Sequence, residues 1–188
     1  EHAAACRDAA AVGRAGGGGV VTVDYRLGRY QDVLADVECD AVVCDPPYGA
    51  RTHGGHDTIA GRADLADGNT RASIDYGFWC HEDVADFVDQ LAPRVRGWIV
   101  ALTSHDLISA WESAYADNGR YAFAPVPCVM PGMSVRMAGD GPSSWTVYAM
   151  AARPRRLPFS KWGTLPGAYL QRRTSEWQNG GGGGRGKP

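Results

Sequence analysis

"VVCDPPYGARTHGGHD", residues 42–57, joins an apolar run to a carboxylate, two prolines and a tyrosine. Residues 41–44 are apolar at every position, which favours a strand buried on both faces, as in the middle of a parallel sheet. Asp45 follows that strand directly. Pro46 and Pro47 fix two φ angles and have no N–H to donate. The corner therefore presents hydrogen-bond acceptors on a rigid backbone, with the ring of Tyr48 beside them.

The segments around this corner predict an α/β domain. Apolar runs favour strands at 20–23, 98–102, 121–123 and 145–151, and helical periodicity favours helices at 82–91 and 105–118, with a short one within 27–34. Residues 49–73 and 125–144 are expected to be loops. Strand and helix alternate and then give way to an antiparallel edge hairpin, which describes part of a doubly wound sheet. In such a sheet the ends of strands 41–44 and 98–102 meet, so Asp45 and segment 103–106 should face one crevice. Ser104 or Asp106 is expected to cap the following helix, and Gly119 to end it.

Composition divides the chain into three segments. Residues 1–19 form a poorly anchored segment, in which the alanines favour a helix over residues 1–15 and Gly16–Gly19 form a linker. Residues 20–152 form the α/β domain. Residues 153–188 are basic and glycine-rich. Residues 151–188 carry a formal charge of +7, which leaves the first 150 residues at −9. A basic end on an acidic body suits a polyanion such as DNA, although a solvated basic tail explains the same charge.

Cysteine usage and hydropathy bound the environment of the chain. The five cysteines are odd in number, widely spaced and without a CxxC pair, which disfavours a zinc ribbon and favours the reducing cytoplasm. No apolar run approaches the roughly 20 residues of a membrane helix. No membrane partner is therefore expected.

The corner suits one kind of ligand, an aromatic amine. The Asp45 carboxylate and the Pro46 carbonyl can accept both N–H groups of the exocyclic amine of a base swung out of its helix, while Tyr48 stacks on the ring. Drawing the nitrogen toward a tetrahedral shape frees its lone pair for attack on a methyl donor. Asp45, Pro46, Pro47 and Tyr48 are therefore the predicted catalytic residues. A proline-stiffened turn in a purely structural α/β domain is the alternative.

The DPPY motif at the end of an apolar strand resembles the catalytic motif of the amino-methylating DNA methyltransferases. In that family Asp-Pro-Pro-Tyr usually accompanies adenine N6, and Ser-Pro-Pro-Tyr more often cytosine N4. The resemblance extends over "LGRYQDVLADVECDAVVCDPPYG", "SVRMAGDGPSSWTVYAMAARP" and "KWGTLPGAYL". It implies a Rossmann-like methyltransferase fold, S-adenosylmethionine as cofactor, double-stranded DNA as partner, and site-specific adenine-N6 methylation by the permuted subclass. A non-catalytic DNA-binding remnant remains open, as does methylation of cytosine N4, RNA or a protein amide.

The family's cofactor loop, Phe-x-Gly-x-Gly, is absent from the sequence. In the permuted subclass that loop lies downstream of a Lys-Pro pair such as Lys187–Pro188, so the cofactor-binding half of the sheet is expected to be missing. Asp24, which follows an apolar run, is a weak candidate for binding the cofactor's ribose. A partial sheet exposes apolar faces and strand edges, which predicts low stability or pairing with a second copy of the chain.

Basic side chains are the predicted phosphate contacts. They are Arg51, His53, Arg153, Arg155, Arg156, Lys161, Arg172 and Arg173. His53, His56 and Asp57 are too few ligands for a convincing metal site, so we expect no metal and a loop that orders on DNA.

Overall fold

The computed structural model describes residues 12–14, 20–57, 76–131, 146–156 and 165–171. The chain divides into two compact units, residues 1–38 and residues 39–188. Each unit has its own architecture. The predicted boundary at residue 20 differs from this division, which falls between Glu38 and Cys39.

The first unit contains a small hairpin and one helical turn. Strands β1 (Val12–Arg14) and β2 (Val20–Thr22) pair antiparallel, so the helix expected over residues 1–15 is wrong at its end; residues 1–11 lie outside the described part. Valine and threonine favour extended backbone, and pairing with β2 outweighs the helix preference of the alanines. Helix α1 (Tyr30–Val33) confirms the short helix, and Arg26 holds it by donating to the Val33 carbonyl at 2.8 Å.

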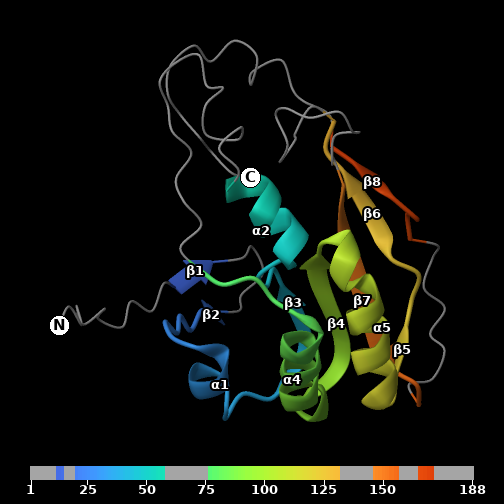
Figure 1. Cartoon of the computed structure of the whole chain (residues 1–188). Coiled ribbons are helices and arrows are strands. Elements are labelled where there is room, and N and C mark those ends of the chain that lie inside the picture. Colours follow the sequence, from blue (N-terminus) through green and yellow to red (C-terminus); the bar gives the residue numbers. More distant parts are fainter. Residues whose placement is uncertain (1–11, 15–19, 58–75, 132–145, 157–164, 172–188) are drawn as a thin grey trace, which may run out of the picture. The chain divides into compact units, whose positions relative to one another are not determined.

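The second unit is built on a six-stranded mixed sheet (Figure 1). Its strands are β3 (Cys39–Cys44), β4 (Val95–Thr103), β5 (Arg120–Ala122), β6 (Val126–Val129), β7 (Thr146–Pro154) and β8 (Tyr169–Leu170). The order is β3-β4-β7-β6-β8, and β5 also pairs with β7. Strands β3 and β4 are parallel, whereas β7 runs antiparallel to β4, β5 and β6. The α/β class with an antiparallel hairpin is thus confirmed, with β7 inside the sheet and not at its edge.

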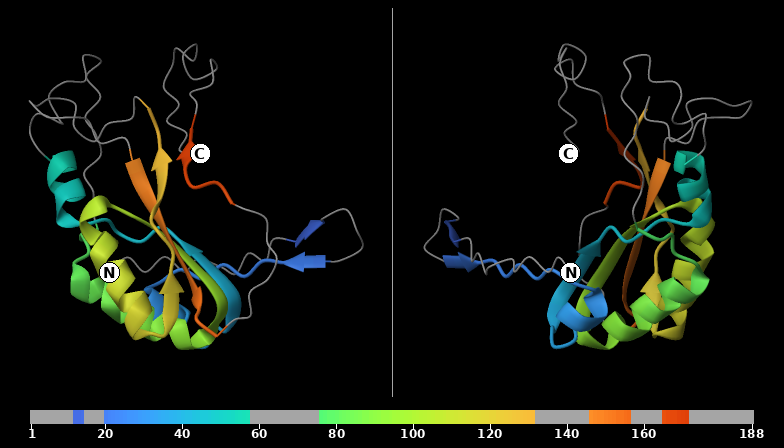
Figure 2. Two further views of the ribbon diagram at one scale, coloured as in Figure 1. Left: turned by 90° about the vertical axis from the view of Figure 1, so that its right-hand side faces the viewer. Right: turned by 60° about the vertical axis from the view of Figure 1, so that its left-hand side comes forward.

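Helices α4 (His81–Leu91) and α5 (Ile108–Asp117) lie on one face of this sheet (Figure 2). Alternate residues of β4 and β7 point toward them, as the period of a strand requires, so Ile99, Ala101, Met150 and Ala152 are buried. Two polar contacts tie α5 to the sheet: Trp111 Nε1 donates to Thr103 Oγ1 at 3.1 Å, and the Tyr115 hydroxyl donates to the Met150 carbonyl at 3.2 Å. The core therefore lies between the sheet and these two helices.

The other face of the sheet is exposed at β3, whereas the residues of β4 and β7 on that face are partly buried. Val43, in the middle of β3, is 80% exposed. The expectation that this strand is buried on both faces is wrong here, because β3 is an edge strand of the described sheet and the described helices of its unit pack on the opposite face. The sheet is thus a partial form of the doubly wound sheet that the sequence predicts.

Local structure confirms some predicted elements and corrects others. Helix 82–91 and strand 98–102 are confirmed by α4 and β4, and Gly119, at φ +65°, ends α5 as expected. Helix α2 (Ala50–Asp57) replaces the start of the expected loop 49–73, and β6 replaces part of the expected irregular stretch 125–144. Short 3-10 turns precede β4 and α5, at Ala92–Arg94 (η1) and His105–Leu107 (η2).

Candidate functional site at the carboxyl edge of the sheet

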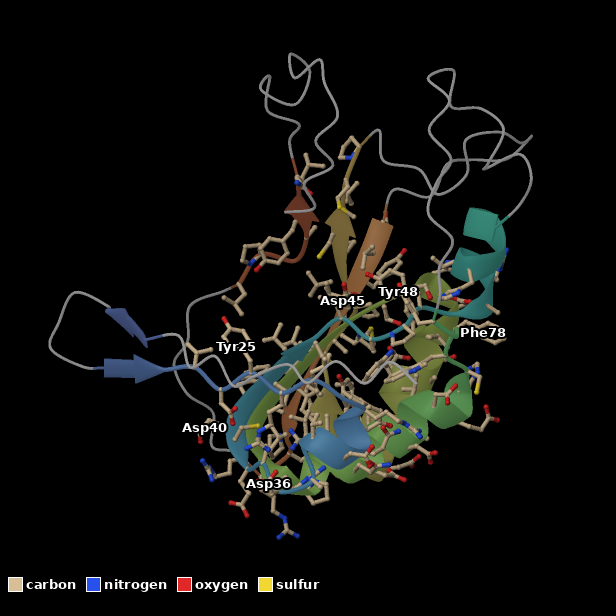
Figure 3. All side chains as sticks on the ribbon, turned by 90° about the vertical axis from the view of Figure 1, so that its left-hand side faces the viewer. Tyr25, Asp36, Asp40, Asp45, Tyr48 and Phe78 are labelled. Atoms are coloured by element: carbon tan, nitrogen blue, oxygen red, sulfur yellow. The ribbon has the colours of Figure 1, made fainter. Side chains whose placement is uncertain are left out.

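The parallel pair β3 and β4 gives the second unit two distinct edges. Cys44 pairs with Ala101 near the strand ends, and Cys39 pairs with Val95 at their beginnings. We call the edge where the strands end, at Cys44 and Thr103, the carboxyl edge, and the edge where they begin, at Cys39 and Val95, the amino edge. Asp45 lies at the carboxyl edge and Asp40 near the amino edge (Figure 3).

A pocket of about 450 Å³ opens at the carboxyl edge. It is lined by Asp45, Pro46, Pro47, Tyr48 and Tyr76. Its size falls in the range of sites for small molecules, roughly 300–1,000 Å³. The four residues predicted from the DPPY motif therefore share one concave surface, together with one tyrosine from elsewhere in the chain.

The Tyr48 hydroxyl lies near the Asp45 carboxylate, so the acidic and aromatic parts of the corner are neighbours. Burial raises the pKa of Tyr48, and the neighbouring Asp45 carboxylate raises it further. The phenol therefore stays protonated at neutral pH and can act as a donor. A ligand amine that binds Asp45 would compete with this hydroxyl for the carboxylate.

Two hydrogen bonds hold the backbone of Tyr48 and its neighbour. The Gly49 N–H donates to Ser104 Oγ at 3.0 Å in a buried contact, and the Trp79 N–H donates to the Tyr48 carbonyl at 3.1 Å. Ser104 was expected to cap the following helix, but its side chain makes no capping bond there. Its hydroxyl instead accepts the bond from Gly49, which ties the corner to the end of β4.

The residue after Tyr48 lies close to Asp106. A Cβ on Gly49 would clash with the Asp106 carboxylate, so any other residue here would have to displace that side chain. The Oδ2 atom of this carboxylate lies 3.4 Å from the Arg51 backbone nitrogen, at the start of α2, where a negative charge is favourable. Contacts from Gly49 to Ser104 and Asp106 thus bring segment 103–106 next to the corner, whereas none of the described residues that line the Asp45 pocket comes from that segment.

We call the contacts of Tyr48 with Trp79 and of Gly49 with Ser104 and Asp106 the Gly49 clamp. An aromatic cluster connects this clamp to the core. The Trp79 ring lies 5.2 Å from the Phe87 ring and 6.4 Å from the Trp111 ring, between centroids. Helix α4 begins one residue after Cys80, whose N–H donates to the Asp83 carboxylate at 2.8 Å. The segment that holds the Tyr48 carbonyl is therefore fixed by both packing and a helix start.

Cys44 lies directly before the corner, at the end of β3. Its thiol donates to the Val100 carbonyl at 3.6 Å. Burial, followed by the Asp45 charge, raises the pKa of Cys44 to about 12. The thiol is therefore protonated and unreactive at neutral pH, and the reactive group of the corner is the carboxylate.

His53 and Tyr76 pack together beside the pocket. His53, on α2, is only 9% exposed, and its ring meets Tyr76 edge-on at 5.5 Å and Phe78 at 6.1 Å. The ring predicted to contact DNA is thus enclosed by aromatic side chains, whereas Arg51 is exposed on the same helix. The sequence analysis assigns no role to Tyr76, although the aromatic residues at 76, 78 and 79, just before a helix, could have indicated one.

The described arginines of the basic segment lie at the amino edge. Arg153 donates to the Pro154 carbonyl at 3.2 Å, and its guanidinium lies 5.8 Å from the centre of the Tyr121 ring. The Arg155 N–H bonds to the Gly119 carbonyl, and the side chains of Arg155 and Arg156 are exposed. The structure therefore does not bring these residues to the DPPY corner. Lys161, Arg172 and Arg173 lie outside the described residues.

The structure does not place Asp24 in the strand–loop–helix unit that a ribose ligand of S-adenosylmethionine would need. Asp24, the candidate ribose ligand, is paired with Arg26 at 2.9 Å, and the nearest strands, β1 and β2, form an antiparallel hairpin in place of a strand–loop–helix unit. Among the described side chains no group of three metal ligands occurs. No helix in the described ranges is long and apolar enough to cross a membrane.

Comparison with known proteins gives a distant likeness only. No family model and no curated protein sequence matches the chain. The crystal structure of the M1.HpyAVI–SAM complex resembles it with 17% identity and a TM-score of 0.44, covering 73% of this chain and 54% of that one. A second crystal structure, of M1.HpyAVI, gives 17% identity and a TM-score of 0.42, covering 71% and 57%. The chain thus spans little more than half the length of these proteins.

Proposed function

We propose that this chain supplies the acceptor side of a DNA methyltransferase that transfers a methyl group from S-adenosylmethionine to the N6 amine of adenine. The observation that carries the proposal is the pocket in which an exposed carboxylate, Asp45, stands beside the ring of Tyr48. An acceptor next to an aromatic ring matches an extruded base, which is held by its edge and by its face.

The corner would act by positioning and by charge. Asp45 and the Pro46 carbonyl accept the two amine hydrogens, which turns the nitrogen lone pair out of the ring. S-adenosylmethionine supplies an electrophilic methyl group when bound. As the bond from the nitrogen to the methyl carbon formed, the sulfur–methyl bond would break and leave S-adenosylhomocysteine. Asp45 would stabilise the positive charge that develops on the nitrogen until its extra proton passes to solvent.

The clamp around Gly49 supports this assignment. A reacting group has to be held to within a fraction of an ångström, and such groups are held best by rigid elements. Tyr48 has its own carbonyl bonded to Trp79, and the next N–H is bonded to Ser104. Such fixation at the carboxyl edge of a sheet, where ligands of α/β proteins bind, favours a ligand site over a simple turn.

The test is transfer of a labelled methyl group. The chain is incubated with labelled S-adenosylmethionine and double-stranded DNA, the DNA is digested, and the labelled nucleoside is identified. We expect N6-methyladenine from the wild type and none from Asp45→Ala. Label on cytosine N4, RNA or protein would refute the adenine assignment.

Calorimetry with S-adenosylmethionine tests the donor side separately. Because the described residues around Asp24 do not form the strand–loop–helix unit of a cofactor site, we expect no tight binding by the chain alone, and the transfer assay is therefore run at a high cofactor concentration. DNA binding that survives Asp45→Ala, with no transfer under any of these conditions, would favour a non-catalytic remnant.

A further inference from the structure

We infer that Tyr76 is a second aromatic wall of the pocket, which contacts the face of the extruded base that Tyr48 leaves open. This inference rests on the proposed function, because it takes a nucleobase as the occupant. It adds a substrate-contacting residue that the DPPY motif does not contain.

Among the described residues, Tyr76 is the one that lines this pocket from outside the corner. It lies before α4, and it is 56% exposed although its neighbours in the chain enter the core at Trp79. An exposed aromatic ring at the mouth of a polar pocket is available to a ligand. Tyr76 also lies within electrostatic reach of Tyr48, whose pKa it helps to raise.

The surroundings of Tyr76 hold its ring in place. His53, itself nearly buried, meets the ring edge-on with an interplanar angle of 81°. The centre of the Phe78 ring lies 6.1 Å from the centre of the His53 ring. The backbone three residues after Tyr76 is bonded to the Tyr48 carbonyl through the Trp79 N–H. His53 is therefore a positioning residue for Tyr76, and both tyrosines of the pocket depend on the same short segment.

Two aromatic rings and a carboxylate around one pocket select for a flat ligand with an amine at its edge. Stacking of a base on an aromatic side chain contributes roughly 1–3 kcal/mol, judged by alanine substitution. The amide group of a protein side chain is a much smaller plane than a base and gains less from a second ring. Tyr76 thus favours a nucleobase over a protein amide as the substrate of this pocket.

The test uses the full chain and an oligonucleotide that contains 2-aminopurine, a fluorescent analogue of adenine, opposite an abasic position that eases extrusion. Binding affinity and the fluorescence of the bound state are measured for wild type, Tyr76→Phe and Tyr76→Leu. Tyr169→Leu is the matched control, because Tyr169 is 52% exposed on β8 and does not line the pocket.

We expect the wild type and Tyr76→Phe to quench the bound fluorophore by stacking. Tyr76→Leu should bind about 5- to 100-fold more weakly and leave the bound fluorophore brighter, while Tyr169→Leu behaves as wild type. Unchanged melting temperatures verify that the variants fold. Wild-type affinity and quenching in Tyr76→Leu would overturn the role of Tyr76 alone. If the wild type neither binds nor quenches, the proposed function fails and this inference fails with it.

Discussion

The two edges of the sheet use polar residues in opposite ways. At the amino edge, Arg120 is 2% exposed and donates to the carbonyls of Gly97 at 2.8 Å and Ala92 at 2.7 Å. Its charge satisfies the protein's own backbone, although burial lowers the pKa of Arg120. At the carboxyl edge, the exposed Asp45 carboxylate lines a pocket beside the Tyr48 hydroxyl. A buried charge with several fixed partners stabilises the fold, whereas an exposed charge on a fixed backbone is available to a ligand.

The largest expected effect on stability comes from the amino edge. Arg120→Met keeps the length of the side chain but leaves several buried carbonyls without a donor. Each such loss costs about 1–3 kcal/mol, so the free energy of unfolding should fall by about 3 kcal/mol or more. Urea unfolding followed by circular dichroism measures it. Arg155→Met, an exposed arginine, serves as the control, and a loss below 1 kcal/mol for Arg120→Met would contradict the structural role.

The largest expected effect on function comes from the carboxyl edge. Asp45→Ala removes the acceptor that orients the amine and stabilises its developing charge, so methyl transfer should fall by about 100-fold or more. Asp40→Ala is the matched control, since Asp40 is the second residue of the same strand, β3, and pairs with Arg96 on the surface at 2.9 Å. We expect transfer by Asp40→Ala to stay within about twofold of wild type, because exposed ion pairs contribute little. Equal losses in the two variants would remove the distinction between the edges.

The clamp at Gly49 should give an intermediate effect. Ser104→Ala leaves the buried Gly49 N–H without an acceptor, which should lower the free energy of unfolding by about 1–3 kcal/mol. It should also weaken binding of the 2-aminopurine oligonucleotide, because Tyr48 loses a support of its backbone. Ser104→Thr keeps the hydroxyl and should restore binding, while Ser109→Ala, on the exposed side of α5, should change neither quantity. No rescue by threonine would show that the hydrogen bond is not what positions Tyr48.

Some of these features could be predicted from the sequence, and others could not. The corner could be predicted because Asp45, Pro46, Pro47 and Tyr48 are adjacent, and the chemistry of adjacent residues does not depend on the fold. Helix α4 and strand β4 could be predicted because their apolar residues recur with the period of the element. The Gly49–Ser104 bond could not, because it joins residues 55 positions apart.

The corrected elements have a common physical cause. Helix α2 contains two glycines and polar residues, and nothing in its own pattern favours a helix. It is supported from elsewhere, by the Asp106 carboxylate near its first turn and by the burial of His53 against Tyr76 and Phe78. Likewise, β1 becomes a strand through its pairing with β2. Tertiary contacts override local preference at these places, and a single sequence does not reveal them.

The two cysteines at the ends of β3, Cys39 and Cys44, should affect the pH dependence of stability differently. The pKa of Cys44 is raised from about 9 when unfolded to about 12 when folded, so the folded state holds this proton more tightly. The resulting stability is fully present below pH 9 and is lost as the pH rises toward 12. Between pH 8 and pH 10.5, the free energy of unfolding should therefore fall by about 1–2 kcal/mol less in Cys44→Ala than in the wild type. Urea unfolding under reducing conditions measures it. Cys39→Ala, at the amino end of the strand, controls for loss of a thiol.

The smallest expected effect concerns DNA phosphates at the two edges. Ala149 pairs with Leu102 and therefore lies level with Asp45 across the sheet. Arg155 follows Ala149 by six residues, which places it roughly 20 Å from that level at about 3.3 Å per residue. Arg51 is exposed on α2, beside the pocket. If the base enters the pocket, Arg51→Ala should reduce the slope of log affinity against log salt by about 1, whereas Arg155→Ala should leave it unchanged.

Titrating DNA binding at several salt concentrations distinguishes these outcomes. A reduced slope for Arg155→Ala alone would place the duplex at the amino edge, far from Asp45, and would contradict entry of the base into this pocket. A reduced slope in both variants would require the DNA to follow the sheet from one edge to the other. The contrast between two exposed arginines on the same unit therefore tests where the polyanion lies, independently of whether methyl transfer occurs.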